Sequence, residues 1–261
     1  MTAPRSVGHV PWYAETGPAD GPLVVLVDGT MDRAAGMLAL ARRLEDRRPD
    51  RYCILRYDRR GYGRSSHDGP FDMALQVDDL VTLLDGRPAV VFGHSYGGNV
   101  ALAVATRHPE QVRGVAIYES PQSWEPWWPR RTAGAAAVES GDDPAVAAEV
   151  FMRRLVGDAR WESLPERTRA TRRAEGPAMV GELGELRLGA PWRSDDITMP
   201  LVAAAGERAR SHHREGMARL AAAVPGADYV ELLGCGHDAP TAAPDLFVDQ
   251  IVVPLLDRCT W

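Results

Sequence analysis

The sequence predicts an α/β fold, with a mostly parallel central sheet flanked by helices. Short, continuous apolar runs of strand length alternate with helical patterns along the chain. The run at residues 23–27 is apolar throughout, as expected for a central strand that is buried on both faces. With 261 residues, the chain is long enough for one complete α/β domain with a large core and a small subdomain.

Strands and helices are expected to alternate from one end of the chain to the other. An edge strand at 10–15 precedes a turn cluster rich in glycine and proline. Further strands are expected at 23–27, 52–57, 89–92, 112–118, 201–205 and 229–233. Helices are expected at 35–44, 71–85, 96–107, 144–156, 164–174, 211–223 and 244–256. The helix that begins at Tyr96 should end before Pro109, because the residue preceding a proline disfavours helical backbone.

The composition argues against several functional classes. The net charge of −6 gives no electrostatic case for binding nucleic acid, and all 30 basic residues are arginine. Cys53, Cys235 and Cys259 fit neither a disulfide framework nor a metal-ligand spacing, so we expect a reducing, cytoplasmic environment. Neither a signal-peptide pattern nor a membrane-spanning run is present, which predicts a soluble protein without membrane association. The expected partner is a small-molecule substrate, and the oligomeric state is left open.

The pattern Gly93-x-Ser95-x-Gly97 predicts a sharp turn between a strand and a helix. Such a turn strains the backbone of the serine and brings the strand and the helix so close that both flanking positions must be very small. The serine hydroxyl is then presented clear of the sheet, near the positive end of the following helix. This geometry favours a nucleophile, with the backbone N–H of Tyr96 facing a developing oxyanion.

Four motifs occur in the order and rough spacing of the α/β-hydrolase family, and the chain resembles this family outside a middle segment. They are Val24-Val25-Leu26-Val27-Asp28-Gly29-Thr30, Tyr57-Asp58-Arg59-Arg60-Gly61-Tyr62-Gly63-Arg64-Ser65, Gly93-His94-Ser95-Tyr96-Gly97-Gly98 and Gly234-Cys235-Gly236-His237. The resemblance implies an α/β-hydrolase fold whose core is formed by 1–121 and 193–261. It also implies a helical cap at 122–192, where many members insert helices over the active site.

The resemblance assigns roles to several residues. Ser95 would be the nucleophile and His237 the general base, while the N–H groups of Thr30 and Tyr96 would form the oxyanion hole. Asp28 stands where the family usually has histidine, and a carboxylate there would oppose the oxyanion unless it points into a hydrogen-bond network. We favour a structural Asp28 that anchors its loop through backbone N–H groups over a weakened or specialised oxyanion hole. No metal or organic cofactor is implied.

The acid of the triad is not where most family members carry it, because Ala209 occupies that position. Glu119 follows the preceding strand, where haloalkane dehalogenases of the same fold place an acid, and is our preferred candidate. Glu207 is the alternative, although it stands only one residue past a glycine. Asp238 adjoins His237 and is badly placed to reach its Nδ1 atom. A chain without a triad acid also remains possible at this point.

The predicted cap is rich in tryptophan and arginine, which suggests an apolar, aromatic pocket roof. Arginines in it would be either solvated or available to an acidic group. Four tryptophans are candidate substrate-binding residues: Trp124, Trp127, Trp128 and Trp161. Among the histidines, His94 is expected to pack or hydrogen-bond beneath the turn, and His212 and His213 are expected to face solvent.

These assignments predict a serine hydrolase that forms an acyl-enzyme and cleaves a small to medium apolar or aromatic ester, lactone or thioester. One alternative is a non-hydrolytic enzyme on the same site, such as a carbon–carbon lyase, a cyclase or a cofactor-free oxygenase, for which Asp28 is the main support. The other is a ligand-binding protein with a vestigial triad, which the absence of an acid at Ala209 would favour.

Overall fold

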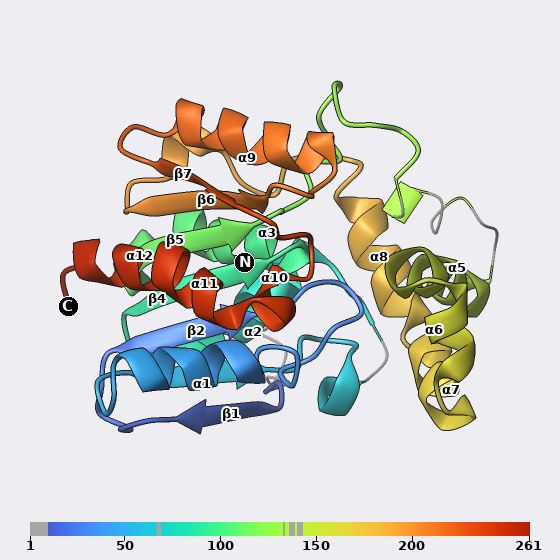
Figure 1. Cartoon of the computed structure of the whole chain (residues 1–261), viewed down its shortest axis with the longest axis horizontal. Coiled ribbons are helices and arrows are strands. Elements are labelled where there is room, and N and C mark those ends of the chain that lie inside the picture. Colours follow the sequence, from blue (N-terminus) through green and yellow to red (C-terminus); the bar gives the residue numbers. More distant parts are fainter. Residues whose placement is uncertain (1–9, 67–68, 133, 136–138, 140–142) are drawn as a thin grey trace, which may run out of the picture.

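The computed structural model describes residues 10–66, 69–132, 134–135, 139 and 143–261. Within these residues, seven strands form one sheet in the order β1-β3-β2-β4-β5-β6-β7 (Figure 1). Strand β1 is antiparallel to β3, and the other pairs are parallel. The strands are β1 Tyr13–Thr16, β2 Leu23–Val27, β3 Cys53–Tyr57, β4 Ala89–His94, β5 Val112–Tyr118, β6 Leu201–Gly206 and β7 Asp228–Leu232.

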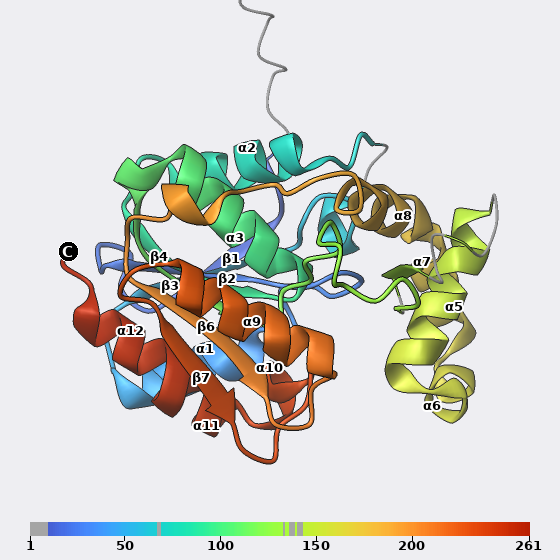
Figure 2. The ribbon, with the colours of Figure 1, turned by 90° about the horizontal axis from the view of Figure 1, so that it is seen from above.

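Helices cover both faces of the sheet (Figure 2). The helices α2 (Met73–Leu84), α3 (Tyr96–Arg107) and α9 (Ser211–Ala223) pack on one face. The other face is covered by α1 (Leu38–Arg47) and the C-terminal helices α11 (Pro244–Phe247) and α12 (Val253–Arg258). Alternate residues of β2 enter the two apolar cores, so this strand is buried on both faces as predicted. The predicted α/β architecture is confirmed.

Several predicted bounds coincide with the structure, including those of β2, β5, α3 and α9. The closing helix expected at 244–256 is instead interrupted, because a π-helical segment, Val248–Val252, separates α11 from α12. Pro254 has no N–H to donate to the carbonyl four residues earlier, and the wider turn lies directly before it. Short 3-10 turns occupy Gly63–Ser65, Pro109–Gln111 and Ser194–Asp196, and α10 spans Ala239–Ala242.

Four helices that the structure describes between β5 and β6 form a group that we call the insert: α5 (Pro144–Val156), α6 (Asp158–Ser163), α7 (Glu166–Ala174) and α8 (Gly176–Glu185). They lie beside the edge of the sheet at which the parallel strands end (Figure 1). A third apolar cluster joins the insert to Met31 and Tyr62 of the core loops. The exact division into core (1–121 and 193–261) and cap (122–192) remains a prediction. Residues 1–9 and 67–68 of the predicted core, and 133, 136–138 and 140–142 of the predicted cap, lie outside the described part of the chain.

Among the described residues, every helix is too short or too polar to cross a bilayer.

Candidate active site

The turn at Ser95 joins β4 directly to α3 and has the predicted strain. Ser95 adopts φ 52° and ψ −124°, a conformation that side chains of L residues rarely adopt. A Cβ atom at Gly93 would lie 2.4 Å from the carbonyl oxygen of Gly97, and one at Gly97 would lie 2.3 Å from that of Asp28. Both distances are far below van der Waals contact, so only glycine fits at these positions.

The loop after β2 runs beside this turn. A Cβ atom at Gly29 would lie 3.0 Å from that of Ser95, and the next residue, Thr30, lines the same cavity as Ser95. The N–H of Tyr96 belongs to the first residue of α3 and therefore has no acceptor within the helix. The Thr30 N–H has no acceptor among the described residues. Two backbone donors next to the serine are thus free to bind a ligand.

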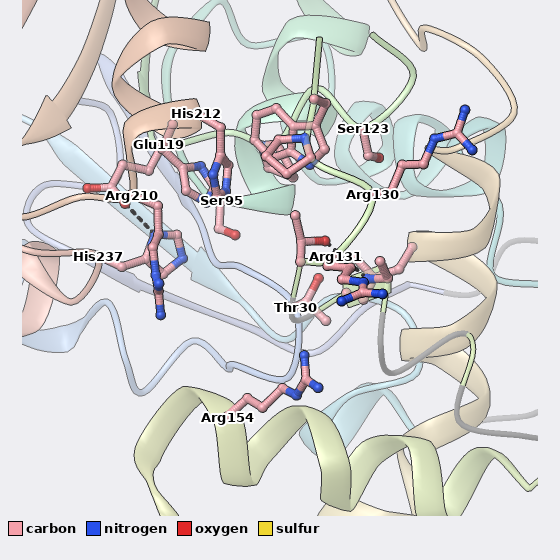
Figure 3. A pocket seen from close by; sticks show the side chains of 18 of the residues that line it. Thr30, Ser95, Glu119, Ser123, Arg130, Arg131, Arg154, Arg210, His212 and His237 are labelled. Atoms are coloured by element: carbon pink, nitrogen blue, oxygen red, sulfur yellow. Dashed lines mark hydrogen bonds and ion pairs between the residues drawn. The ribbon is translucent and has the colours of Figure 1, made fainter. Parts of the chain in front are cut away.

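Glu119 and His237 form a hydrogen-bonded pair at the ends of β5 and β7. The distance from His237 Nδ1 to Glu119 Oε2 is 2.7 Å, and the Gly206 N–H donates to the other carboxylate oxygen at 3.0 Å (Figure 3). The Glu119 side chain is 1% exposed and that of His237 is 33% exposed. The buried carboxylate is therefore fixed by two donors, while its imidazole partner reaches the cavity that Ser95 lines.

Two side chains at the ends of β4 and β5 hold the loop that carries His237. The Tyr118 hydroxyl donates to the carbonyl of Gly236 at 2.7 Å, and His94 Nε2 donates to the carbonyl of His237 at 2.9 Å. Burial lowers the pKa of His94 well below its ordinary value, so this histidine is neutral at physiological pH. The predicted structural role of His94 is confirmed by this contact.

The other acid candidates are engaged elsewhere. Glu207 is exposed and accepts a hydrogen bond from the Gly234 N–H at 2.8 Å. Ala209, at the usual position of the family's acid, is only a small side chain in the cavity wall. Among the described carboxylates, Glu119 is the one paired with His237 Nδ1.

Comparisons with known proteins identify the family. A family model described as "Alpha/beta hydrolase family" matches residues 24–250. The chain belongs to this family. Lipase LipV of Mycobacterium tuberculosis is 29% identical to this chain, in an alignment that covers 90% of this chain and 93% of LipV. Two solved structures share the fold.

A hydrolase from Pseudomonas aeruginosa has a TM-score of 0.71 and 24% identity over 94% of this chain and 93% of its own. The enol-lactonase from Burkholderia xenovorans has a TM-score of 0.70 and 23% identity, covering 94% of this chain and 96% of its own.

Asp28, the departure from the usual α/β-hydrolase pattern, points into a buried network. Its Oδ1 accepts from Arg59 Nε at 3.0 Å, and Arg59 Nη1 donates to Glu182 Oε2 at 2.7 Å. Tyr62 donates to the same glutamate at 2.5 Å. The expectation that backbone N–H groups hold Asp28 was wrong, because a guanidinium takes that place. Burial raises the pKa of Asp28, which favours its neutral form and leaves a balanced Arg59–Glu182 ion pair.

His212 and His213 line the cavity, so the prediction that they face solvent was wrong. The His213 ring lies 5.3 Å from that of His237 and 5.1 Å from that of Trp128, between ring centroids. Burial, with His237 adding to the effect, lowers the pKa of His213 well below its ordinary value. Sequence reasoning missed these residues because their ring contacts with Trp128 and His237 join segments far apart in the chain, which no local pattern signals.

Glu119, His213 and His237 also offer one ligand atom each within 4.8 Å of one another. A metal ion bound there would have to replace the proton that joins Glu119 to His237.

The cavity beside Ser95 has a volume of about 880 Å³, and Trp128 contributes to its wall. The three other candidate tryptophans do not line it. Trp161 is fully buried among the helices of the insert, and Trp124 packs edge-on against Trp192 at 5.4 Å. Trp127 lies under the guanidinium of Arg219. Trp124 and Trp161 belong to apolar clusters and Trp127 packs against an arginine, so the wall is less aromatic than the sequence predicts.

Proposed function

We propose that this α/β hydrolase is a serine hydrolase acting on ester-type bonds, with Ser95 as nucleophile, His237 as general base and Glu119 as the acid. The observation that carries the proposal is the pairing of His237 Nδ1 with a buried carboxylate at 2.7 Å. This bond fixes the ring and leaves its Nε2 atom to receive the serine proton. The strained turn that presents Ser95 and the similarity to LipV, which is named a lipase, support the same assignment.

The reaction would proceed through an acyl-enzyme. His237 takes the proton of Ser95 as the hydroxyl attacks the carbonyl carbon, and Glu119 stabilises the imidazolium that forms. The N–H groups of Thr30 and Tyr96 stabilise the oxyanion, next to the positive end of α3. His237 returns the proton to the leaving alcohol, and water then releases the acid by the same steps. The volume of the cavity suits a small to medium ester, lactone or thioester.

The insert is proposed to act as a cap, because Phe151, Arg154 and Leu183 of its helices line the cavity that contains Ser95. A non-hydrolytic chemistry loses its main support, since Asp28 is bound by Arg59 rather than free beside the oxyanion.

The test is covalent labelling with an uncharged fluorophosphonate, followed by intact mass. This probe reports an activated serine whatever the natural substrate. We expect stoichiometric labelling of the wild type and none of Ser95→Ala. Ser123→Ala is the matched control, because Ser123 lines the same cavity and should leave labelling intact. A folded wild type that resists both this probe and a smaller phosphonate would contradict the proposal.

A further inference from the structure

The cavity that contains Ser95 has a strongly cationic wall, although the protein as a whole carries a net charge of −6. Among the described residues, two carboxylates line it, Glu119 and Glu125. Glu119 is paired with His237, and Glu125 accepts a hydrogen bond from the indole of Trp124. Six arginines line the same space: Arg130, Arg131, Arg154, Arg187, Arg208 and Arg210. Positive charge is thus concentrated at the site and not supplied by the overall composition.

Most of these arginines have no acidic partner. Arg187 lies 3.3 Å from Glu139, whereas the other five form no ion pair with any described residue. Two neighbours on α5 show the contrast. Arg153 faces away from the cavity and pairs with Glu149, Asp158 and Glu162, while Arg154 lines the cavity and pairs with no described carboxylate. On α5, the outward-facing arginine is thus neutralised by carboxylates and the cavity-facing one is not.

Arg131 and Arg154 are placed best to meet a substrate. In the view of Figure 3 they are drawn on the same side of the cavity as Thr30, and His237 is drawn on the opposite side, with Ser95 between the two. Arg130 points away from Ser95 in the same view, and Arg210 lies on the side of His237. A substrate whose carbonyl is held at Ser95 would therefore extend its remaining part toward Arg131 and Arg154.

We propose that the substrate carries an anionic group, a carboxylate or a phosphate, at the end remote from the scissile ester, and that Arg131 and Arg154 bind it. This inference rests on the proposed function. A guanidinium offers a planar pair of donors that matches the oxygens of either group. A cationic cavity also raises the local concentration of an anionic substrate. The remaining arginines of the wall add to this attraction.

The experiment compares esters that differ only in charge. The p-nitrophenyl ester of hexanoate is the neutral member, and the mono-p-nitrophenyl ester of adipate has the same chain length with a terminal carboxylate. We expect kcat/KM to be about 10-fold or more higher for the charged ester at low salt. The preference should shrink as ionic strength rises, because the arginines are exposed. A third ester with a terminal phosphate separates the two anions, and succinate and suberate homologues locate the optimal length.

The double variant Arg131→Gln with Arg154→Gln should reduce this charge preference by about 10-fold. Arg167→Gln is the matched control, because Arg167 is an exposed arginine of the insert outside the cavity. The uncharged fluorophosphonate reports the integrity of Ser95 in every variant. If labelling is normal but neither anionic ester is preferred at any chain length, or if the double variant keeps the preference, this inference is overturned while the proposed function stands. Absence of labelling would instead remove the proposed function.

Discussion

Glu119 and Glu182 are both buried glutamates with a nitrogen partner at 2.7 Å, yet their surroundings differ in one decisive respect. The partner of Glu119 is His237, which is one-third exposed and faces the cavity. The partner of Glu182 is Arg59, which is fully buried and stays protonated at every accessible pH. A proton can leave and return at the first pair and cannot at the second. Burial of a carboxylate therefore does not mark a catalytic group by itself; in the proposed mechanism the two pairs are distinguished by whether the partner is exposed and can exchange a proton.

The largest expected effect is the loss of activity when the Glu119–His237 pair is altered. Glu119→Gln removes the charge that stabilises the imidazolium, and kcat for an ester substrate should fall by about 10³-fold. The amide oxygen can still accept from the Gly206 N–H, so the free energy of unfolding should change by less than about 1 kcal/mol. Steady-state kinetics and urea unfolding measure the two effects. Glu207→Gln is the control, and a loss within a few-fold for Glu119→Gln would show that Glu119 is not the acid.

At the second pair the effect should fall on stability. Glu182→Gln leaves the buried guanidinium of Arg59 without its ionised partner, which should cost about 3–5 kcal/mol of unfolding free energy. Asp28→Asn should cost less than about 1 kcal/mol, because the raised pKa of Asp28 favours a neutral side chain already. Urea unfolding of the two variants measures the difference. Equal costs would contradict the assignment of the charge to Glu182.

The smallest expected effect is a pH dependence at His213, which touches the first pair. Its folded pKa lies well below the ordinary value of about 6.5, so below that pH the unfolded chain binds more protons. Stability therefore falls as the pH drops below about 6.5, by at most about 1.4 kcal/mol per pH unit for one histidine. His213→Phe keeps a ring against Trp128 and should make this acid slope shallower, although His94 still contributes in the same direction.

Unfolding measured at several pH values between 7 and 5 tests this, with His108→Gln as the control, because His108 is a one-third-exposed histidine that follows the C-terminal end of α3. An unchanged slope in His213→Phe would show that His213 is not the titrating group.

The elements that the sequence predicted well are those whose constraints are local. The apolar run Leu23–Val27 indicates a strand buried on both faces. The glycines around Ser95 indicate positions where backbone atoms lie too close for a Cβ atom. Glu119 could be found because it stands at a fixed position, the end of a strand. The pairing with Arg59 could not be predicted, because Asp28 and Glu182 are more than 150 residues apart and meet only in the folded chain.

The wall of the cavity was the part most poorly predicted. Trp161 and Arg154 lie on neighbouring helices, and their sequence pattern does not say which face meets the core and which meets the cavity. Packing decided this, since large apolar rings release more free energy when fully buried than when they line a solvent-filled space. Trp161 is therefore buried inside the insert, whereas Arg154, whose charge is costly to bury, lies at the wall.

The end of the insert at α8 is tied to the core by three carboxylates, and this restricts how the site can open. Glu175 binds Arg33 and the Gly63 N–H, Glu182 binds Arg59 and Tyr62, and Glu185 binds the Met73 N–H. Among the described residues, α5 and α6 contact the core through apolar side chains and form no hydrogen bond with it. These polar contacts fix α8 to the core, whereas α5 is held against the core by apolar packing. Because Arg154 lies on α5, any shift of that helix would change the distance between Arg154 and Ser95.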